Sequence, residues 1–403
     1  MRQPCGAAFT LEMALASRIV INGRARTSRR PTGSLGGKLA KSDFIDLTSK
    51  ARQLTVVTRL HASDGSGKAA PVVIELDMTS FCDFGCPECI SADVLGVARL
   101  SRGRLLDLAR EMAEAGVRAV ILTGGGEPLR HHAAREVIAR LQEVGIAVGM
   151  ITNGYLLANV PVDVIAEMAW IRVSLDAATA GTFALMRPHP DGPRAFERVL
   201  AGIAHAVDAG GRVGASFVSI VRTTGDERVT NIGEIAEAAA LAKHLGCAYF
   251  NVKAMQNDDH SLFFYEERDR EELARQVNLA LALAGDGFEV ARSGNIDAVL
   301  RGDTAQEKSY SRCASAGLRA LITPEGMYPC AYHRGNANLR VPVAPSTTPF
   351  AQLWQEYRPD HVDPRRDCRF HCARHEANLE LEVVLAAPEI GALHATPDTD
   401  LFI

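Results

Sequence analysis

The chain has 403 residues, of which 47% are hydrophobic and 23% charged, a balance typical of a globular protein with one large domain or two. Its formal net charge of −4 argues against binding to nucleic acid or to an anionic membrane. No apolar run approaches the length that spans a bilayer, and residues 1–21 lack the charged start and apolar core of a secretory signal. We therefore expect a cytoplasmic protein that binds neither nucleic acid nor membrane.

Residues 1–70 show little regular hydrophobic pattern. A Gly/Ser/Arg-rich stretch runs from Arg24 to Lys38, and a second loose stretch runs from Ala62 to Lys68. Such composition is typical of chain that cannot bury enough apolar surface to order itself. We predict an amino-terminal arm over residues 1–70 that is partly disordered and partly helical.

From Pro71 onward, short apolar strands alternate with helical patterns. Strands are predicted at residues 72–76, 119–122, 146–151, 171–175, 212–221 and 248–252. Helices are predicted at residues 105–115, 132–144, 163–168, 195–209, 232–245 and 266–284. This alternation predicts an α/β fold over residues 71–285, with a parallel sheet and right-handed crossovers, either open or closed into a barrel.

Three cysteines follow the first predicted strand with the spacing C-x3-C-x2-C: Cys82, Cys86 and Cys89. The chain has nine cysteines, and this odd number and their clustering favour metal ligation over disulfides. A tetrahedral structural zinc site requires four ligands, whereas a four-iron cluster held by three cysteines leaves one iron open to a substrate or cofactor. The alternative is a zinc knuckle that borrows a distant histidine such as His61.

Three further motifs fall at the ends of the next predicted strands: Gly124–Pro128, Thr152–Gly154 and Ser174–Asp176. Taken alone, the first is a turn before a helix and lacks the Lys-Ser/Thr of a phosphate loop, and the third is an ordinary polar strand end. The carboxyl ends of parallel strands share one edge of a sheet, and that edge carries the site in such folds. The motifs together therefore predict one cavity.

This combination of motifs resembles the radical S-adenosylmethionine (radical SAM) enzymes over roughly residues 71–260. The resemblance implies a partial (β/α)6 parallel barrel in which Cys82, Cys86 and Cys89 hold a [4Fe-4S] cluster whose open iron takes the amino and carboxylate groups of SAM. An electron then breaks a carbon–sulfur bond, and the resulting 5′-deoxyadenosyl radical abstracts hydrogen from the substrate. The family often has an aromatic residue before the third cysteine, where this chain has Glu88, so we expect no side-chain stacking on adenine there.

The resemblance also implies six further cofactor-binding residues. Gly125, Gly126 and Glu127 would lie against the methionine moiety of SAM, because glycine lets the backbone approach closely and a carboxylate accepts from an ammonium group. Near the ribose or the methionine carboxylate would lie Asn153, Ser174 and Asp176.

Beyond the predicted barrel the pattern changes. A β-hairpin is predicted at residues 318–332 around a Pro-Glu-Gly turn, followed by a proline-rich linker at 341–349 and an irregular loop at 359–375. We predict a small cysteine-rich module over residues 286–380 and a carboxyl-terminal tail over residues 381–403.

Four cysteines of this second part can ligate a metal completely: Cys313, Cys330, Cys368 and Cys372. One interpretation is a structural zinc, for which His371 or His375 could substitute as a ligand. The module also resembles the shortened twitch type of auxiliary-cluster extension, rather than the full SPASM type with seven cysteines and two clusters. We therefore predict one auxiliary [4Fe-4S] cluster that transfers an electron or shapes the pocket.

Two other features are candidates for catalysis. Cys247 stands alone before the sixth strand, and it is either core filler or a hydrogen donor, as a thiol is in some radical epimerases. A charged group follows the same strand and is either a solvated loop or the source of a proton acceptor: Lys253, Asp258, Asp259 and His260.

We predict a radical SAM oxidoreductase or isomerase in natural-product biosynthesis, resembling the radical SAM dehydrogenases of aminoglycoside pathways. Its substrate would be a polar small molecule, namely an aminocyclitol, amino sugar or nucleoside, with oxidation, epimerisation or elimination as the outcome. A flavodoxin or ferredoxin would donate the electron. The alternatives are a radical SAM maturase that modifies a ribosomally synthesised peptide, and a zinc-stabilised binding protein.

Overall fold

The computed structural model describes residues 47–62, 69–224, 226–257, 263–358, 361–387, 395–398 and 400–402. Of the predicted amino-terminal arm, it describes two helices, α2 (Leu47–Lys50) and α3 (Leu54–Ala62), and the residues before Leu47 lie outside the described part. No described helix is long and apolar enough to cross a membrane.

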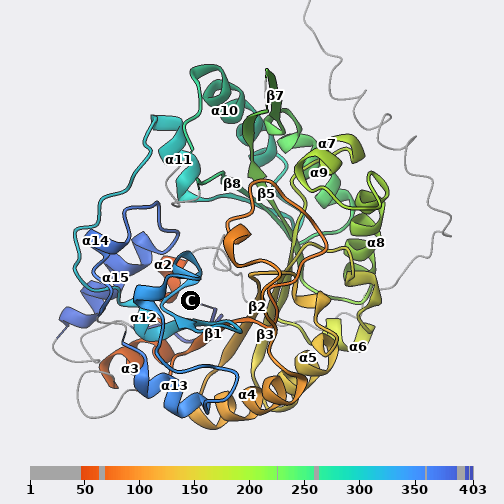
Figure 1. Cartoon of the computed structure of the whole chain (residues 1–403). Coiled ribbons are helices and arrows are strands. Elements are labelled where there is room, and N and C mark those ends of the chain that lie inside the picture. Colours follow the sequence, from red (N-terminus) through yellow and green to blue (C-terminus); the bar gives the residue numbers. More distant parts are fainter. Residues whose placement is uncertain are drawn as a thin grey trace, which may run out of the picture. The chain divides into compact units, whose positions relative to one another are not determined.

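A largely parallel sheet organises the fold (Figure 1). Within the described residues its order is β11-β10-β1-β2-β3-β4-β5-β8-β9, and each strand runs parallel to its neighbours except β11. The α/β class with a parallel sheet is thus confirmed. The strands are β1 Val73–Asp77, β2 Ala119–Thr123, β3 Ala147–Thr152, β4 Trp170–Ser174, β5 Val213–Ser219, β8 Tyr249–Ala254, β9 Glu289–Arg292, β10 Arg319–Ile322 and β11 Met327–Tyr328.

Helices connect the parallel strands, and α4, α5, α6 and α8 lie along the outer side of the sheet in Figure 1. A separate antiparallel hairpin, β6 (Val221–Thr224) with β7 (Glu227–Thr230), was not predicted from the sequence. The longer helices are α4 Arg102–Ala115, α5 Ala134–Glu143, α8 Arg194–Asp208, α9 Ile235–His244, α10 Glu267–Leu281, α11 Gly294–Arg301 and α15 His375–Ala386. The shorter ones are α6 Val162–Ala166, α7 Ala180–Met186, α12 Ser315–Leu318, α13 Phe350–Glu356 and α14 Pro364–Asp367.

Local sequence fixes the ends of α4. The hydroxyl of Ser101 accepts from the backbone N–H of Arg104 at 3.2 Å, which satisfies one of the free donors of the first turn. The helix stops at Gly116, whose φ of 89° is left-handed and strains any residue with a Cβ. A 14-residue helix between these caps places β2 alongside β1.

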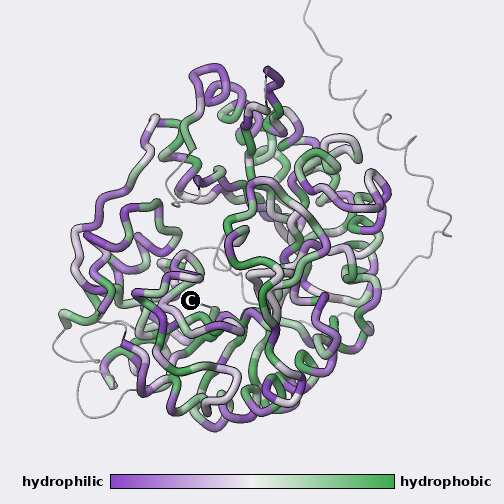
Figure 2. The backbone as a smooth tube through the Cα atoms, viewed as in Figure 1, coloured by the Kyte–Doolittle hydropathy of each residue, from purple (hydrophilic) through white to green (hydrophobic). Residues whose placement is uncertain are grey.

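An apolar cluster closes the amino ends of the strands. It joins Val57 of α3, Val73 of β1 and Leu381 of α15, and the ring of Trp170 packs edge-on against Phe402 with 5.3 Å between centroids. In Figure 2 hydrophobic residues are frequent in the strands, and hydrophilic ones are frequent in α10 and the β6–β7 hairpin. Burial of these side chains removes water from this end of the sheet and leaves the opposite, carboxyl end for a site.

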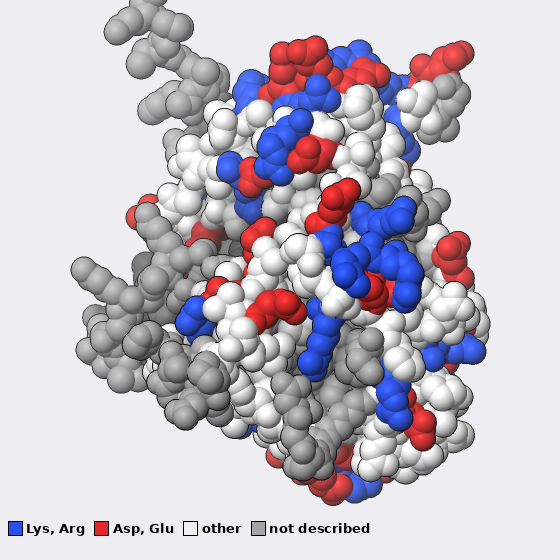
Figure 3. Space-filling view, turned by 90° about the vertical axis from the view of Figure 1, so that its left-hand side faces the viewer, with Lys and Arg blue, Asp and Glu red and all other residues white. Residues whose placement is uncertain are grey.

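The side of the molecule on which α11, α14 and α15 lie in Figure 1 carries both signs of charge. In Figure 3 basic and acidic side chains are interspersed there with neutral ones. Exposed pairs such as Arg365 with Asp363, at 2.8 Å, belong to α14 and its flank. Pairs of this kind contribute little to stability because water screens them.

The carboxyl-terminal part is not separate from the sheet. β10 pairs in parallel with β1 from Val73 to Leu76, so the predicted hairpin at residues 318–332 extends the main sheet. The predicted boundary between residues 380 and 381 falls inside α15. β10 pairs with β1 because the edge of β1 would otherwise present a row of unpaired backbone N–H and C=O groups.

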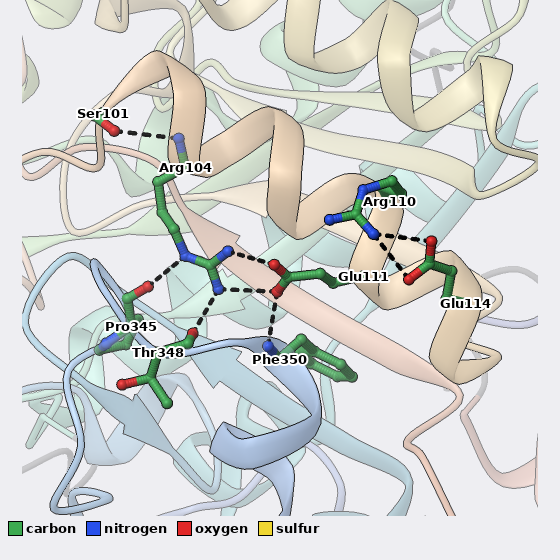
Figure 4. A network of polar contacts seen from close by, with 8 residues as sticks. All are labelled: Ser101, Arg104, Arg110, Glu111, Glu114, Pro345, Thr348 and Phe350. Carbon is green, nitrogen blue, oxygen red and sulfur yellow. Dashed lines mark hydrogen bonds and ion pairs between the residues drawn. The ribbon is translucent and has the colours of Figure 1, made fainter.

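The predicted proline-rich linker at residues 341–349 is also fixed to the barrel (Figure 4). The guanidinium of Arg104 in α4 donates to the carbonyls of Pro345 at 2.8 Å and Thr348 at 2.6 Å. Glu111, about two turns further along the same face of α4, accepts from Arg104 at 2.9 Å and from the N–H of Phe350 at 2.7 Å. These contacts position α13 against α4.

Candidate functional site

The cysteine loop begins directly after β1 and brings its three thiols together. Cys82 interacts electrostatically with Cys86, and Cys86 with Cys89, and all three are free, partly accessible thiols. Burial raises the pKa of Cys82 to about 11, so the free thiol is protonated at neutral pH and a bound metal would displace its proton. Three thiols on one loop are a donor set for a metal centre.

Two contacts anchor this loop to the strands beside it. The side-chain amide of Asn153, after β3, donates to Asp83 at 2.5 Å and lies 3.9 Å from the sulfur of Cys82. The ring of Phe84 packs between Tyr155 and Phe183, with centroid separations of 5.9 and 5.8 Å. Asn153 therefore positions the loop through Asp83 while its amide also faces the sulfur.

The glycine motif after β2 packs directly on the cysteine loop. The N–H of Gly125 donates to Asp77 at 2.8 Å, and the N–H of Glu127 donates to the carbonyl of Phe81 at 2.9 Å. A Cβ on Gly126 would lie 2.3 Å from that carbonyl oxygen, so only glycine fits there. Because Gly126 has no Cβ, the glycine motif can pack directly against the backbone of the cysteine loop.

Glu127 is a buried carboxylate with three donors. It is 3% exposed and accepts from the hydroxyl of Thr152 at 2.7 Å and from the backbone N–H of Asn153 at 2.7 Å and of Leu129 at 3.1 Å. Burial outweighs these hydrogen bonds and raises the pKa of Glu127 to about 7. The group is therefore poised between its charged and neutral forms at physiological pH.

The two predicted residues at the end of β4 differ in what they contact. Ser174 is partly buried at the strand end. Asp176 has a left-handed φ of 47°, and its carboxylate accepts from the N–H of Val218 at 2.8 Å and from Arg187 at 2.6 Å. Such a backbone conformation persists where its surroundings over-determine it. Asp176 thus holds β4, β5 and Arg187 together, and Arg187 in turn lies electrostatically beside Cys86.

Glu88, the unusual residue of the signature, makes an ion pair. Its carboxylate lies 2.8 Å from the guanidinium of Arg222, and the two side chains are 9% and 18% exposed. Arg222 belongs to β6, so this pair ties the cysteine loop to the β6–β7 hairpin. The second carboxylate oxygen of Glu88 is buried without a hydrogen-bond partner among the described residues.

The four later cysteines also come together. Electrostatic interactions connect Cys368 with Cys330, Cys313 and Cys372, and burial raises the pKa of Cys313 to about 11 and that of Cys330 to about 12. A ring nitrogen of His333 lies 3.3 Å from the sulfur of Cys368. Cys313 lies just before α12 and Cys330 just after β11, while Cys368 follows α14 and Cys372 lies in the loop before α15.

The candidate histidine ligands of this group make other contacts. His375 stacks on Tyr310 and lies 3.2 Å from its hydroxyl. His371 is buried, and burial lowers its pKa to about 4, so it is neutral at physiological pH. In the part of the chain that the structure describes, no three His, Cys, Asp or Glu side chains converge on one metal-ion position.

Buried ion pairs connect the two cysteine groups. Arg334, four residues after Cys330, donates to Asp77 at 2.6 Å and to Ser91 at 3.1 Å. Glu75, at 3% exposure, accepts from Arg374 at 2.5 Å and pairs with Arg319. Asp77 therefore joins the glycine motif to the segment that follows Cys330, and Glu75 joins β1 to the segment that follows Cys372.

The structure does not bring every predicted residue to this edge. Cys247 lies before β8, at the amino end of the strand and therefore opposite the cysteine loop, buried at 4% exposure. We assign it no part in the site. Lys253 lies near the carboxyl end of β8, whereas Asp258, Asp259 and His260 are outside the described residues. His61 lies in the last turn of α3, which packs at the amino ends of the strands.

Several positioning residues were missed from the sequence. Asp77 had a usable signal, since an acid that ends an apolar strand must find a partner when it is buried. No sequence signal identified Arg187, Arg222 and Arg334, because each pairs with a carboxylate that only the tertiary fold brings near. Arg334 and Asp77 are 257 positions apart in the chain.

Comparison with known proteins identifies the core of the chain. The model of the radical SAM superfamily matches residues 76–236. The chain is 31% identical over 187 residues to an AdoMet-dependent heme synthase of Methanosarcina barkeri, which covers 45% of this chain and 50% of the relative. It is 33% identical over 140 residues to a probable GTP 3′,8-cyclase of Saccharolobus islandicus, which covers 34% of this chain and 44% of the relative. The matches thus span about half the length of these curated relatives or less.

The fold is also similar to solved structures. The crystal structure of Streptococcus suis SuiB bound to S-adenosylmethionine superposes with a TM-score of 0.54 at 15% identity, over 72% of this chain and 67% of SuiB. At this identity the likeness concerns the fold alone. The sequence match covers the cysteine loop, the glycine motif and both later rim motifs, all of which lie at one edge of the sheet. Residues 76–236 of this chain are therefore a radical SAM superfamily domain.

Proposed function

We propose that this chain is a radical SAM enzyme that cleaves SAM reductively and abstracts hydrogen from a polar small molecule. The observation that carries the proposal is that Cys82, Cys86 and Cys89 lie within electrostatic reach of one another on one loop, next to the buried carboxylate of Glu127, at one edge of the parallel sheet. When bound, a [4Fe-4S] cluster and SAM supply a one-electron source and a hydrogen-abstracting radical.

The chain's own residues would bind and orient the cluster and SAM, and they would exclude water from the site. The three thiolates hold the cluster, and the carboxylate of Glu127, fixed by Thr152 and the backbone of Asn153, accepts the ammonium group of SAM. Ser174 stands at the end of β4 for the ribose or the methionine carboxylate. The apolar cluster around Trp170 closes the other end of the sheet against water.

We also propose that Cys313, Cys330, Cys368 and Cys372 hold one auxiliary [4Fe-4S] cluster. A single zinc draws its four ligands to within about 2.3 Å of one point, whereas a cluster spreads its cysteines over different irons. The electrostatic interactions that connect Cys368 with Cys330, Cys313 and Cys372 place the four thiols in one group, which is the donor set that such a cluster requires. The guanidinium of Arg374 lies electrostatically close to three of these thiols, and its positive charge favours an anionic centre.

For the substrate we propose an aminocyclitol, amino sugar or nucleoside that is oxidised, epimerised or undergoes elimination, with a flavodoxin or ferredoxin as the electron donor. The names of the curated relatives refer to heme and to GTP, which supports a small molecule over a ribosomally made peptide. The opposing result would be turnover of a precursor peptide with no turnover of any small molecule of these classes.

Anaerobic reconstitution tests the initiating chemistry. With iron, sulfide, SAM and dithionite, we expect about eight irons per chain and formation of 5′-deoxyadenosine. Iron is measured by chelation, zinc by mass spectrometry and 5′-deoxyadenosine by chromatography. Zinc as the main metal, or intact clusters that cleave no SAM, would refute the proposal.

SAM binding is expected to weaken as the pH falls through about 7. The raised pKa of Glu127 means that its carboxyl takes up a proton below about pH 7 and loses the charge that attracts the ammonium group of SAM. The affinity, measured by equilibrium dialysis, should be about tenfold lower at pH 6 than at pH 8.

The variant Glu127→Gln separates this effect from general acid sensitivity. It should bind SAM weakly at both pH values and without the pH slope. Glu143→Gln, which removes an exposed carboxylate from α5, should keep the slope of the unmodified protein. A slope that persists in Glu127→Gln would assign the titration to another group.

A further inference from the structure

One face of the parallel sheet is polar. In parallel strands, paired residues point to the same side, and Arg172 pairs with Gly214, which pairs with Tyr249. The next rows up are Ser174–Ser216–Asn251 and Val218–Lys253. The alternate residues Ile171, Val173 and Val252 are buried and apolar. Arg172 and Lys253 therefore share one face, which we call the polar face.

The two cations on the polar face repel each other. The charge of Arg172 is the largest cause that lowers the pKa of Lys253, to about 7, and burial adds to it. Both side chains stay partly accessible rather than sealed in the core. Two like charges so placed destabilise the ligand-free site, and an anion between them would relieve that repulsion.

Neither cation makes an ion pair among the described residues, although the charge of Asp176 acts on Lys253 and that of Glu75 on Arg172. The carboxylates that share this part of the sheet are engaged elsewhere, Glu75 with Arg319 and Arg374, Asp77 with Arg334, and Asp176 with Arg187. The guanidinium of Arg172 lies over the ring of Trp170, 6.0 Å from its centroid, and its buried Nε–H has no hydrogen-bond partner. A buried donor without a partner costs free energy unless a ligand satisfies it.

We propose that Arg172 and Lys253 form a subsite for an anionic group of the substrate, a carboxylate or a phosphate. This inference rests on the proposed function and narrows its substrate to a member of the proposed classes that also carries such a group, as a phosphorylated amino sugar or nucleoside does. The planar guanidinium of Arg172 supplies two parallel donors, and the ammonium of Lys253 supplies a point charge. The charge of Asp176 acts on both Lys253 and Cys86, so the proposed subsite lies on the same side of the sheet as the cysteine loop.

The carboxylate of SAM is the other anion that could occupy this subsite, and the test separates the two sources. Inorganic phosphate serves as the probe, titrated into the reconstituted full chain under anaerobic conditions with SAM already bound. Arg172→Gln and Lys253→Gln should each weaken phosphate binding at least tenfold and should change the affinity for SAM less than twofold. Arg110→Gln, which neutralises an arginine on the exposed face of α4, is the control and should bind phosphate normally.

Thermal unfolding provides a second readout that does not depend on activity. Phosphate should raise the melting temperature of the unmodified protein but not that of Arg172→Gln, and Arg172→Lys should restore part of the shift. Unchanged phosphate binding in both glutamine variants would overturn the proposal, and so would a parallel tenfold loss of SAM affinity, which would assign the cations to the cofactor. Failure of the unmodified chain to cleave SAM, with phosphate binding still lost in the variants, would refute the proposed function and leave the anion subsite standing.

Discussion

Replacement of Cys86 by alanine is expected to abolish the formation of 5′-deoxyadenosine, by at least about a thousandfold, because two thiolates cannot hold a cluster that three position. Cys86 is the central thiol of the loop and interacts electrostatically with both Cys82 and Cys89. The iron content should fall from about eight to about four per chain, since the four later cysteines keep their ligands. Iron analysis and chromatography of the reaction products measure both effects.

The matched control is Cys247→Ala. This cysteine is buried at the opposite end of the sheet and contacts neither cysteine group, so its removal should leave both the iron content and SAM cleavage nearly unchanged. It should cost only the small destabilisation of a minor cavity, on the order of 1 kcal/mol. If Cys86→Ala still cleaved SAM, or if Cys247→Ala did not, the assignment of the three-cysteine loop would be wrong.

Replacement of Glu75 by glutamine is expected to lower the free energy of unfolding by about 3–5 kcal/mol. The carboxylate is 3% exposed and is the shared partner of Arg319 and Arg374, so its loss leaves two buried cations facing each other. It also removes the contact between β1 and the segment that follows Cys372. Anaerobic denaturant unfolding of the reconstituted protein measures the change.

The same carboxylate should leave a signature in the pH dependence of stability. Burial by itself raises the pKa of Glu75, but the guanidinium groups of Arg319 and Arg374 outweigh it and hold the pKa at about 2. The stabilisation, about 3 kcal/mol, is complete above the ordinary glutamate pKa near 4.5 and is lost as the pH falls from there towards 2. Glu75→Gln should lack this component of acid sensitivity.

A surface carboxylate provides the comparison. Glu114→Gln removes the exposed partner of Arg110 on α4 and should produce no measurable change in unfolding or in its pH profile. A loss of stability in Glu75→Gln no greater than that in Glu114→Gln would show that the charges around β1 are not coupled as the structure indicates.

Local sequence was sufficient where the signal was itself local. The period of apolar residues predicted strands at the positions of β1 to β5 and β8 but not β9, and Gly116 marked the end of α4, whose start lies before the predicted Leu105. The three-cysteine spacing and Gly124–Pro128 were recognisable because a loop motif needs no distant partner. Their meeting at one edge followed from a rule of parallel sheets, without knowledge of the coordinates.

Other features depended on pairings that no local pattern encodes. β10 adds to β1 across more than 240 residues, because the open edge of β1 needs a partner, and this joins the predicted second module to the barrel. In the sequence, Glu88 was only a departure from the usual signature. In the structure it pairs with Arg222 of the β6–β7 hairpin, which the sequence did not predict. Cys247 precedes β8 and therefore lies at the amino end of that strand, away from the cysteine loop at the carboxyl ends.

The sequence by itself determined which side chains can bind a metal and a cofactor, because three clustered cysteines and a Gly-Gly-Glu turn offer the same donor atoms in any fold of this class. Only the tertiary structure decided which charged side chains form ion pairs. Glu75, Asp77 and Asp176 each pair with an arginine from another element, whereas Arg172 and Lys253 share the polar face without an ion pair among the described residues. Burial makes an unpaired charge costly, so the pairing of each group is a property of the whole fold and cannot be inferred from neighbours in the chain.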